Sequence, residues 1–353
     1  MKKIFIRSGV IVFWITLIFS VLYFPNWNPF EGNERSLNVF CWGNILQNSV
    51  IADFEQKTGI KVHLNYYSSN EELIVKMKAT KGKGYDLIIP SDYAVQILAK
   101  ESLLKEIDKT QLFFWNHINP LLLNHFYDLD NHFSIPFEWE IYGMGINKDY
   151  FQNKVLDPSW NLIFSPPEYK ISMINDPIEA VLFAGFYLYG PLDALNPIQA
   201  EAVKKLLVQQ RSWVEAYSDF RTDYFLATKN CPVVLSSSSY IWQALNKLNF
   251  VDFIVPKEGT FITIENLCIP EKSKKEQLAY QLINHLMQPE SIAIHYKRYG
   301  FFPSTLHALD TLNLSPKQEE LIRSSTEDFK KYHFTEVLIP EQQIRDIWVE
   351  VKS

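Results

Sequence analysis

The sequence of 353 residues lacks the glycine-rich motifs by which proteins hold nucleotide phosphates, because neither a P-loop nor a Rossmann fingerprint is present. It also lacks a G-x-S-x-G nucleophile elbow around its serine run at residues 236–239, and no base is placed near that run by spacing. We therefore expect neither nucleotide hydrolysis nor serine-based catalysis from this chain, and we expect no cofactor.

Cysteine is scarce, and the spacing of the three cysteines matches no metal motif. Cys41, Cys231 and Cys268 allow two alternatives, one disulfide with a free thiol or three buried thiols. The histidines between residues 117 and 132 recur at intervals that would share a helix face, but Asn119-Pro120 interrupts them. We expect no metal site.

The chain also has no excess of basic residues, because it contains 34 Lys and Arg and 40 Asp and Glu. Residues 1–24 contain three basic and no acidic side chains, so the total of −6 leaves −9 on the rest of the chain. Such an acidic chain argues against nucleic acid as a partner, because phosphate binding depends on Lys and Arg. It permits a cationic ligand, although the same charge can serve solubility alone.

A long apolar run lies at the N-terminus, from Gly9 to Phe24, behind three basic residues. Its sixteen residues suit the core of a signal peptide and are short for a membrane-spanning helix of about 20 residues. The bulky end of the run offers no clear cleavage site, which leaves an uncleaved membrane anchor as the alternative. We expect residues 1–24 to direct export and residues 25–36 to form a linker.

Strand and helix patterns alternate through the first half of the remaining chain. Apolar runs at residues 37–41, 60–66 and 85–89 predict strands, and apolar residues at helical spacing follow each of them. Gly59 should end the first helix, and Ser69 with Glu72 should form a capping box on the second. This β-α order is typical of a parallel sheet covered by helices.

The second half repeats this order less regularly, and the chain is too long for one ordinary domain. We therefore predict an α/β protein of two lobes, each a mostly parallel sheet covered by helices. The predicted strands of the second half are residues 170–174, 232–235, 251–255 and 261–269, and the predicted helices are 178–189, 200–213 and 240–248.

Open parallel sheets bind ligands beyond the carboxyl ends of their strands. Carboxylates and aromatic rings gather at those positions in this sequence, and both groups suit an amine, which needs an anion for its charge and a flat face for its carbon chain. The side chains at these strand ends are Trp42, Ser91, Asp92, Tyr93, Asp176, Glu179 and the serines at 236–239.

Six short segments strengthen this interpretation, because they occur together in the order of a known family. The chain resembles the spermidine/putrescine-binding proteins of bacterial ABC importers from about Leu37 to Gly300. The segments are WGN at 42–44, FEQKTGIKV at 54–62, YSSNEEL at 67–73, YDLIIPSDY at 85–93, FSIPFEW at 133–139 and VPKEG at 255–259.

The resemblance implies the two-lobed periplasmic-binding-protein fold, hinged by crossing strands, with a polyamine held in the cleft between the lobes. Lobe 1 would comprise residues 37–141 and 264–302, and lobe 2 residues 142–263 and 303–353. It also implies a protein that is not an enzyme, located in the periplasm or tethered there by its N-terminus. Its partners would be the inner-membrane permease subunits of an ABC importer.

Residue roles carried over by matching position give a candidate ligand shell. In this shell aromatic side chains hold the carbon chain, a serine contacts it, and carboxylates pair with the ammonium groups. The members are Trp42, Ser91, Tyr93, Asp176, Glu179 and Glu265, the last standing where the family has an aspartate.

Several of these residues have a simpler interpretation. Asp176 precedes Pro177 as a helix N-cap would, with Glu179 in the first turn. Ser91 and Asp92 also precede a predicted helix, and one of them could be its cap. Glu265 fits a strand residue that faces solvent.

The chain departs from the family at three positions. Ser237 and Thr263 replace tryptophans that sandwich the ligand, and Ile45 replaces an aromatic residue after the first-strand tryptophan. Each lost cation–π contact is worth about 0.5–2 kcal/mol. Tyr142, Tyr240 or Trp242 could fill the space from other positions. Otherwise the ligand differs, as another diamine, a longer polyamine or a different organic cation.

Two further glutamates, Glu138 and Glu140, flank Trp139. An acid/base pair is conceivable there, but alternation along an extended segment is the simpler account. Two other classes of function stay open from the sequence, a membrane-anchored enzyme acting on an amine or sugar, and a sensor that retains the fold without coupling to transport.

Overall fold

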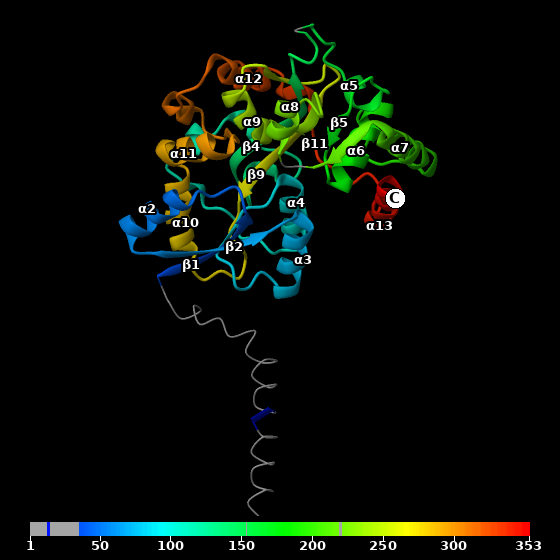
Figure 1. The fold of residues 1–353 in the computed structure, drawn as a ribbon. Coiled ribbons are helices and arrows are strands. Elements are labelled where there is room, and N and C mark those ends of the chain that lie inside the picture. Colours follow the sequence, from blue (N-terminus) through cyan, green and yellow to red (C-terminus); the bar gives the residue numbers. More distant parts are fainter. Residues whose placement is uncertain (1–12, 15–34, 153, 219–220) are drawn as a thin grey trace, which may run out of the picture.

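The computed structural model describes residues 13–14, 35–152, 154–218 and 221–353 (Figure 1). Most of the predicted export segment and linker therefore lies outside the described residues. In the part of the chain that is described, no helix is long and apolar enough to cross a membrane.

The first lobe is built on a three-stranded parallel sheet in the order β2-β1-β3. The predicted strands and helices of this half are confirmed, although the third strand is shorter than expected. The elements are β1 (Ser36–Trp42), α2 (Asn48–Thr58), β2 (Lys61–Tyr67), α3 (Asn70–Thr80), β3 (Leu87–Ile88), α4 (Asp92–Lys100) and, from later in the chain, α10 (Glu276–Leu286).

The helix ends in this lobe follow local sequence signals. Gly59 ends α2 with a φ of 70°, a left-handed conformation that glycine adopts without steric cost. Ser69 caps α3 by accepting a hydrogen bond from the backbone N–H of Glu72 at 3.2 Å. The Glu72 carboxylate accepts from the backbone of Ser68 at 2.9 Å rather than from Ser69, so the predicted capping box is only half correct.

The second sheet has eight strands, with a main order of β11-β9-β4-β7-β5-β6 and with β8 and β10 also paired to β4. Strands β5, β6 and β7 run parallel, whereas β4 is antiparallel to its neighbours. The strands are β4 (Ile135–Asn147), β5 (Ile171–Met173), β6 (Val214–Tyr217), β7 (Val233–Ser237), β8 (Val251–Ile254), β9 (Thr260–Leu267), β10 (Phe302–Pro303) and β11 (Tyr332–Phe334).

Helices cover this sheet, and the predicted helices of the second half are confirmed with small shifts of their ends. Figure 1 shows most of them in the upper part of the molecule, above β1, β2, α2 and α3. The helices are α5 (Asn161–Phe164), α6 (Pro177–Tyr189), α7 (Pro197–Gln210), α8 (Thr222–Thr228), α9 (Ser238–Lys247), α11 (Pro289–Tyr299), α12 (Pro316–Glu327) and α13 (Glu341–Lys352).

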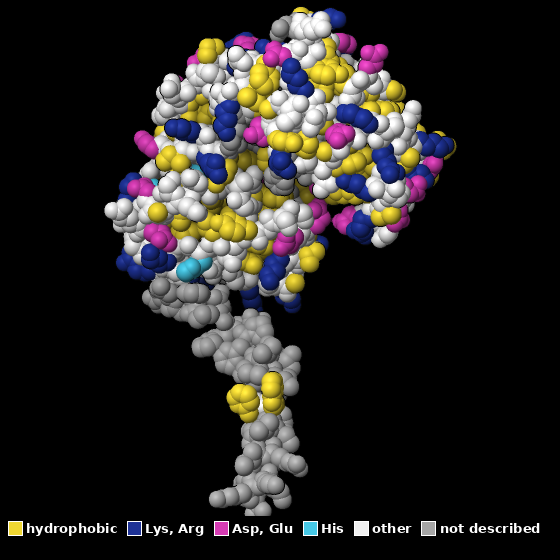
Figure 2. All heavy atoms as spheres, viewed as in Figure 1, with side chains coloured by type: hydrophobic (Ala, Val, Ile, Leu, Met, Phe, Trp, Pro, Cys, Tyr) yellow, Lys and Arg dark blue, Asp and Glu magenta, His cyan; other side chains and the backbone are white. Residues whose placement is uncertain are grey.

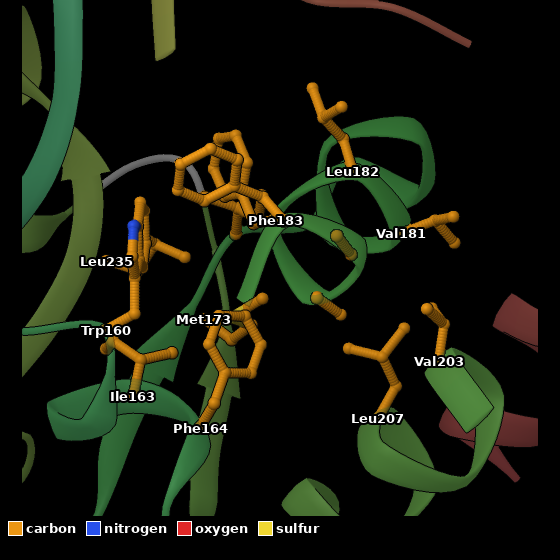
Figure 3. Close-up of a cluster of buried hydrophobic side chains, with 14 of the residues drawn as sticks. Trp160, Ile163, Phe164, Met173, Val181, Leu182, Phe183, Val203, Leu207 and Leu235 are labelled. Atoms are coloured by element: carbon orange, nitrogen blue, oxygen red, sulfur yellow. The ribbon is translucent and has the colours of Figure 1, made fainter. Parts of the chain in front are cut away.

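The core of the second lobe forms where α5, α6 and α7 meet β5 and β7 (Figure 3). Trp160 and Phe183 are buried in this cluster, with ring centroids 5.5 Å apart. The Trp160 indole donates to the carbonyl oxygen of Gly259 at 2.9 Å, which satisfies its polar group inside the core. Burying a large apolar side chain contributes about 1.5–3 kcal/mol, so this cluster anchors the start of α6.

Strand β4 joins the two lobes, because its two halves pair with different partners. Residues Ile135–Ile141 pair with β9, and residues Tyr142–Ile146 pair with β7. The C-terminal end of β9 in turn meets the first sheet through bridges from Ile88 to Cys268 and from Ser91 to Glu265. The lobe boundaries given above stay a prediction, while β4, β9 and β10 are the strands that run together where the lobes meet.

The three cysteines are buried free thiols, so the alternative of a disulfide is wrong. Cys41 lies in β1, Cys268 follows β9 and Cys231 precedes β7, which places them in separate parts of the core. Burial raises the pKa of the Cys41 and Cys231 thiols to about 12. They are packing residues rather than reactive thiols.

Candidate functional site

A pocket lies between the two lobes and collects all six residues predicted as the ligand shell. Its lining comes from the ends of β1 and β2 and the starts of α3 and α4 on one wall, and from the start of α6 on the other. Strands β4 and β7 form the floor together with β9 as far as Thr263, while Glu265 further along β9 belongs to the first wall through its bridge to Ser91. The lining residues that the argument uses are Trp42, Glu71, Ser91, Tyr93, Glu140, Tyr142, Asp176, Glu179, Ser237, Tyr240, Thr263 and Glu265.

Glu265 is held on the first wall by two donors from neighbouring strand ends. The Ser91 hydroxyl donates to Oε1 at 2.7 Å, and the Trp42 indole N–H donates to Oε2 at 3.1 Å. Only 4% of Glu265 is exposed, so the interpretation as a solvent-facing strand residue is wrong. Ser91 holds this carboxylate rather than capping α4, since its side chain makes no cap hydrogen bond.

A second carboxylate on this wall, Glu71, was not expected from the sequence. The Tyr93 hydroxyl donates to its Oε1 at 2.7 Å, which joins the start of α3 to the start of α4. Residues 68–71 directly follow the carboxyl end of β2. The rule that selected Trp42 and Tyr93 at strand ends would therefore also have selected this segment.

The opposite wall is the first turn of α6. Asp176 is its N-cap and accepts from the backbone N–H groups of Ile178 at 2.8 Å and Glu179 at 3.0 Å, with Pro177 at the first helical position. The predicted capping role is thus confirmed. Glu179 accepts a short hydrogen bond from the hydroxyl of Tyr142 on β4. A helix N-terminus favours ionised carboxylates, so these two side chains present negative charge to the pocket.

The floor contains the two positions at which the resemblance implies tryptophan. Glu140 on β4 lies directly opposite Thr263 on β9, and Tyr142 lies directly opposite Ser237 on β7. Directly opposed residues of an antiparallel pair point to the same face of the sheet. Glu140 and Tyr142 therefore stand beside the small side chains that replace the tryptophans.

Of the three aromatic residues that could fill this space, two line the pocket. Tyr142 does so from the floor, and Tyr240 accepts a hydrogen bond from Asn44 of the first lobe at 3.4 Å. Trp242 does not line the pocket, because it is buried against Tyr296 with ring centroids 4.2 Å apart.

The alternation of Glu138 and Glu140 in an extended segment is confirmed, since both lie in β4. Their burial was missed, because Glu138 is 1% exposed and Glu140 is 7% exposed. The signal was the placement of two carboxylates within an otherwise apolar segment, which is costly unless they are paired or neutralised. Glu138 lies directly opposite Glu265 on β9, with its Oε1 3.6 Å from Nδ1 of His295, whereas Glu140 is the one of the two that lines the pocket.

The pocket is strongly acidic. Five carboxylates line it, from Glu71, Glu140, Asp176, Glu179 and Glu265, and no lysine or arginine does so among the described residues. Burial raises the pKa of Glu265 to about 8, and burial likewise raises the pKa of Glu140 above its usual range. A bound cation would offset the desolvation that causes both shifts and the repulsion from Glu140 and Asp92 that adds to the shift of Glu265.

The surface outside the pocket has no comparable bias on the face shown in Figure 2, where basic and acidic side chains are interspersed. The concentration of like charge is a property of the pocket. A hydrolase would need a nucleophile with an adjacent base, whereas Ser237 and Ser239 of the serine run hydrogen-bond to Glu140 and to each other.

A family model described as "Bacterial extracellular solute-binding protein" matches residues 49–321. The chain belongs to this family. Its members are solute-binding proteins rather than enzymes, which places the chain with extracytoplasmic proteins and argues against the enzyme alternative.

Curated relatives agree with the resemblance seen in the sequence. The spermidine/putrescine-binding periplasmic protein of Escherichia coli is 28% identical over 302 residues, which cover 84% of this chain and 86% of that protein. A putrescine-binding periplasmic protein of Pseudomonas aeruginosa is 27% identical over 342 residues, covering 91% of this chain and 93% of the relative.

Solved structures support the two-lobed fold. A spermidine/putrescine ABC transporter protein from Listeria monocytogenes superposes with a TM-score of 0.80 at 25% identity, covering 90% of this chain and 99% of that one. A lipoprotein of Treponema pallidum gives a TM-score of 0.75 at 21% identity, covering 90% of this chain and 99% of that one, and shows the fold alone.

Proposed function

We propose that this protein is the solute-binding component of an ABC importer and that it holds a polyamine in the pocket between its lobes. The observation that carries this proposal is the set of five carboxylates without a lysine or arginine among the described lining residues. Burying an unpaired charge is costly, so such a pocket suits a ligand with several positive charges. The names of the relatives, which bind spermidine or putrescine, point to the same class of ligand.

Each proposed contact follows from the hydrogen bonds already present. Glu265 is oriented by Ser91 and Trp42, and Glu71 by Tyr93, so these carboxylates need little reorganisation to accept an ammonium group. The rings of Trp42 and Tyr93 offer flat faces for methylene groups and for cation–π contact.

The second wall would bind the other end of the ligand. Asp176 and Glu179 lie within one helical turn, and Tyr142 orients Glu179. A polyamine that bridges the two walls would stabilise a closed arrangement of the lobes, which a permease could distinguish from the open form.

The chain would act outside the cytoplasm beside inner-membrane permease subunits, and ATP hydrolysis would belong to another subunit of the importer. We further propose that residues 1–24 direct export and that, if they are retained, they tether the protein to the inner membrane. Mass spectrometry of the protein from membrane and periplasmic fractions tests the tether. Loss of residues 1–24 from every molecule in both fractions would contradict it.

Isothermal titration calorimetry of the full-length chain in mild detergent tests the ligand class. Putrescine, cadaverine, spermidine and spermine form the panel, with basic amino acids and thiamine as alternative cations. We expect at least one polyamine to bind with a Kd of about 10 μM or tighter, since two paired ammonium groups and a buried chain supply several kcal/mol. Failure of every polyamine to bind would contradict the proposal.

A further inference from the structure

The floor of the pocket carries the carboxylate of Glu140, which is not among the predicted ligand contacts. Glu140 is not among the residues that the family resemblance assigns to the ligand. It nevertheless lines the pocket, opposite Thr263 on the neighbouring strand. Because Thr263 is small where the family has tryptophan, the carboxylate is left uncovered by an aromatic ring.

The hydrogen bonds of Glu140 are incomplete on one side. The hydroxyls of Ser237 and Ser239 and the backbone of Ser239 hydrogen-bond to its carboxylate. The other oxygen, Oε2, is buried and has no hydrogen-bond partner among the described residues. A buried carboxylate oxygen without a donor is costly, and a ligand that supplies the donor removes this cost.

The position of Glu140 decides which part of a ligand would meet it. Glu71 and Glu265 belong to one wall and Asp176 and Glu179 to the other, whereas Glu140 lies on the strand between them. Glu265 is the diagonal neighbour of Glu140 on β9, which corresponds to a separation of about 7–8 Å. A chain that bridges the walls therefore passes the floor carboxylate with its interior and not with its ends.

A methylene group at that point would leave the carboxylate desolvated and unpaired, whereas a cationic N–H group would pair with it. We propose that Glu140 is a specificity-determining residue, which selects polyamines that carry a cationic nitrogen between their two terminal ammonium groups. This inference rests on the proposed function, because it assigns a ligand feature to the same pocket.

Two further observations agree with this assignment. Ser237 and Thr263 leave room for polar contact instead of an aromatic wall, so the floor no longer favours a plain hydrocarbon chain. Burial of the Glu140 side chain also disfavours its ionised form, as its raised pKa shows. An internal ammonium group reverses that penalty.

The test compares spermidine with 1,8-diaminooctane, a diamine of the same chain length in which a methylene group replaces the internal nitrogen. Calorimetry on the full-length wild-type chain should give a Kd for spermidine about tenfold lower or more, because a charge-assisted hydrogen bond is worth about 1.5–3 kcal/mol. The Glu140→Gln variant should lose most of this preference, chiefly through weaker binding of spermidine. The surface variant Glu106→Gln is the matched control and should keep the wild-type ratio.

The outcomes separate this inference from the proposed function. Equal binding of the two compounds by the wild-type chain, or a preference that survives in Glu140→Gln, overturns the role of Glu140 while polyamine binding stands. Binding of neither compound overturns the inference, and only failure of the whole polyamine panel overturns the proposed function as well. The wild-type comparison needs no variant, so equal binding of the two compounds overturns the inference even if Glu140→Gln fails to fold, and Glu140→Asn then serves as the second variant.

Discussion

The hydroxyl of Tyr142 donates a hydrogen bond to the carboxylate of Glu179, which connects the floor strand β4 to the first turn of α6. The residue that lies opposite Ser237 thus also orients an anion of the facing wall. We expect a tyrosine in this place to supply part of the aromatic surface that the tryptophans would give and to add a polar contact.

Replacing Tyr142 with phenylalanine tests this double role. The ring stays in place in Tyr142→Phe, but Glu179 loses a donor. A hydrogen bond to a charged group is worth about 1.5–3 kcal/mol, part of which water replaces, so we expect about a three- to tenfold rise in Kd for a polyamine. Calorimetry measures this, and unchanged affinity would show that the hydroxyl does not orient the binding carboxylate.

Removing the charge of Glu179 should have a larger effect. The Glu179→Gln variant keeps the shape of the side chain but loses the ion pair with an ammonium group, so we expect Kd to rise by at least about tenfold. Thermal unfolding without ligand should be close to wild type. Wild-type affinity in this variant would remove Glu179 from the ligand shell.

Asp176 allows its structural and binding roles to be separated. Asp176→Asn retains a side-chain oxygen for the N-cap but loses the charge, whereas Asp176→Ala loses both. We expect the alanine variant alone to lose about 0.5–2 kcal/mol of unfolding free energy, measured by urea titration. Both variants should bind a polyamine more weakly if the charge contacts the ligand, and equal wild-type affinity in Asp176→Asn would restrict this residue to capping.

Binding should depend on pH through Glu265, whose pKa is raised to about 8 by burial and by the nearby carboxylates of Glu140 and Asp92, against the hydrogen bonds from Ser91 and Trp42. A cation favours the ionised form, so binding releases a proton below this pKa. Affinity should therefore rise from pH 6 to about pH 8 and then level off. Calorimetry in buffers of different ionisation enthalpy measures the released proton, and Glu265→Gln should reduce its number.

The same shift predicts an opposite trend for the unliganded protein. The folded pKa of Glu265 lies above its unfolded value, so its contribution to stability is fully present below about pH 4.5 and is lost as pH rises through about 8. Over this interval the unfolding free energy of wild type should fall more steeply than that of Glu265→Gln. Parallel curves would show that Glu265 is not buried with a raised pKa.

The sequence predicted the parts of this molecule that depend on local signals. The β-α order, the end of α2 at Gly59 and the cap at Asp176 each follow from residues close together in the chain. The strand-end rule and the resemblance together selected six side chains that line one pocket. Their contacts with a ligand stay a prediction.

The sequence did not predict which carboxylates are buried, because burial depends on elements that pack together from distant parts of the chain. The alternation around Trp139 indicated which face Glu138 and Glu140 share, but not that other elements bury that face. The burial of Glu265 was missed for the same reason, because the residues that contact its carboxylate, Ser91 and Trp42, lie far from it in the sequence. Burial depends on how the lobes assemble, and the apolar residues around Glu138 and Glu140 were only an indirect local signal of it.

The shared strand β4 has a consequence for the order of events during capture. The floor residues Glu140 and Tyr142 belong to the strand about which the lobes would turn, so their separation changes little when the walls move apart. The walls meet a ligand together only after closure. We therefore expect a cation to bind first to Glu140 and Tyr142 on β4 and to contact the side chains of the two walls only when the lobes close. A ligand without charge at its centre would then dissociate before closure.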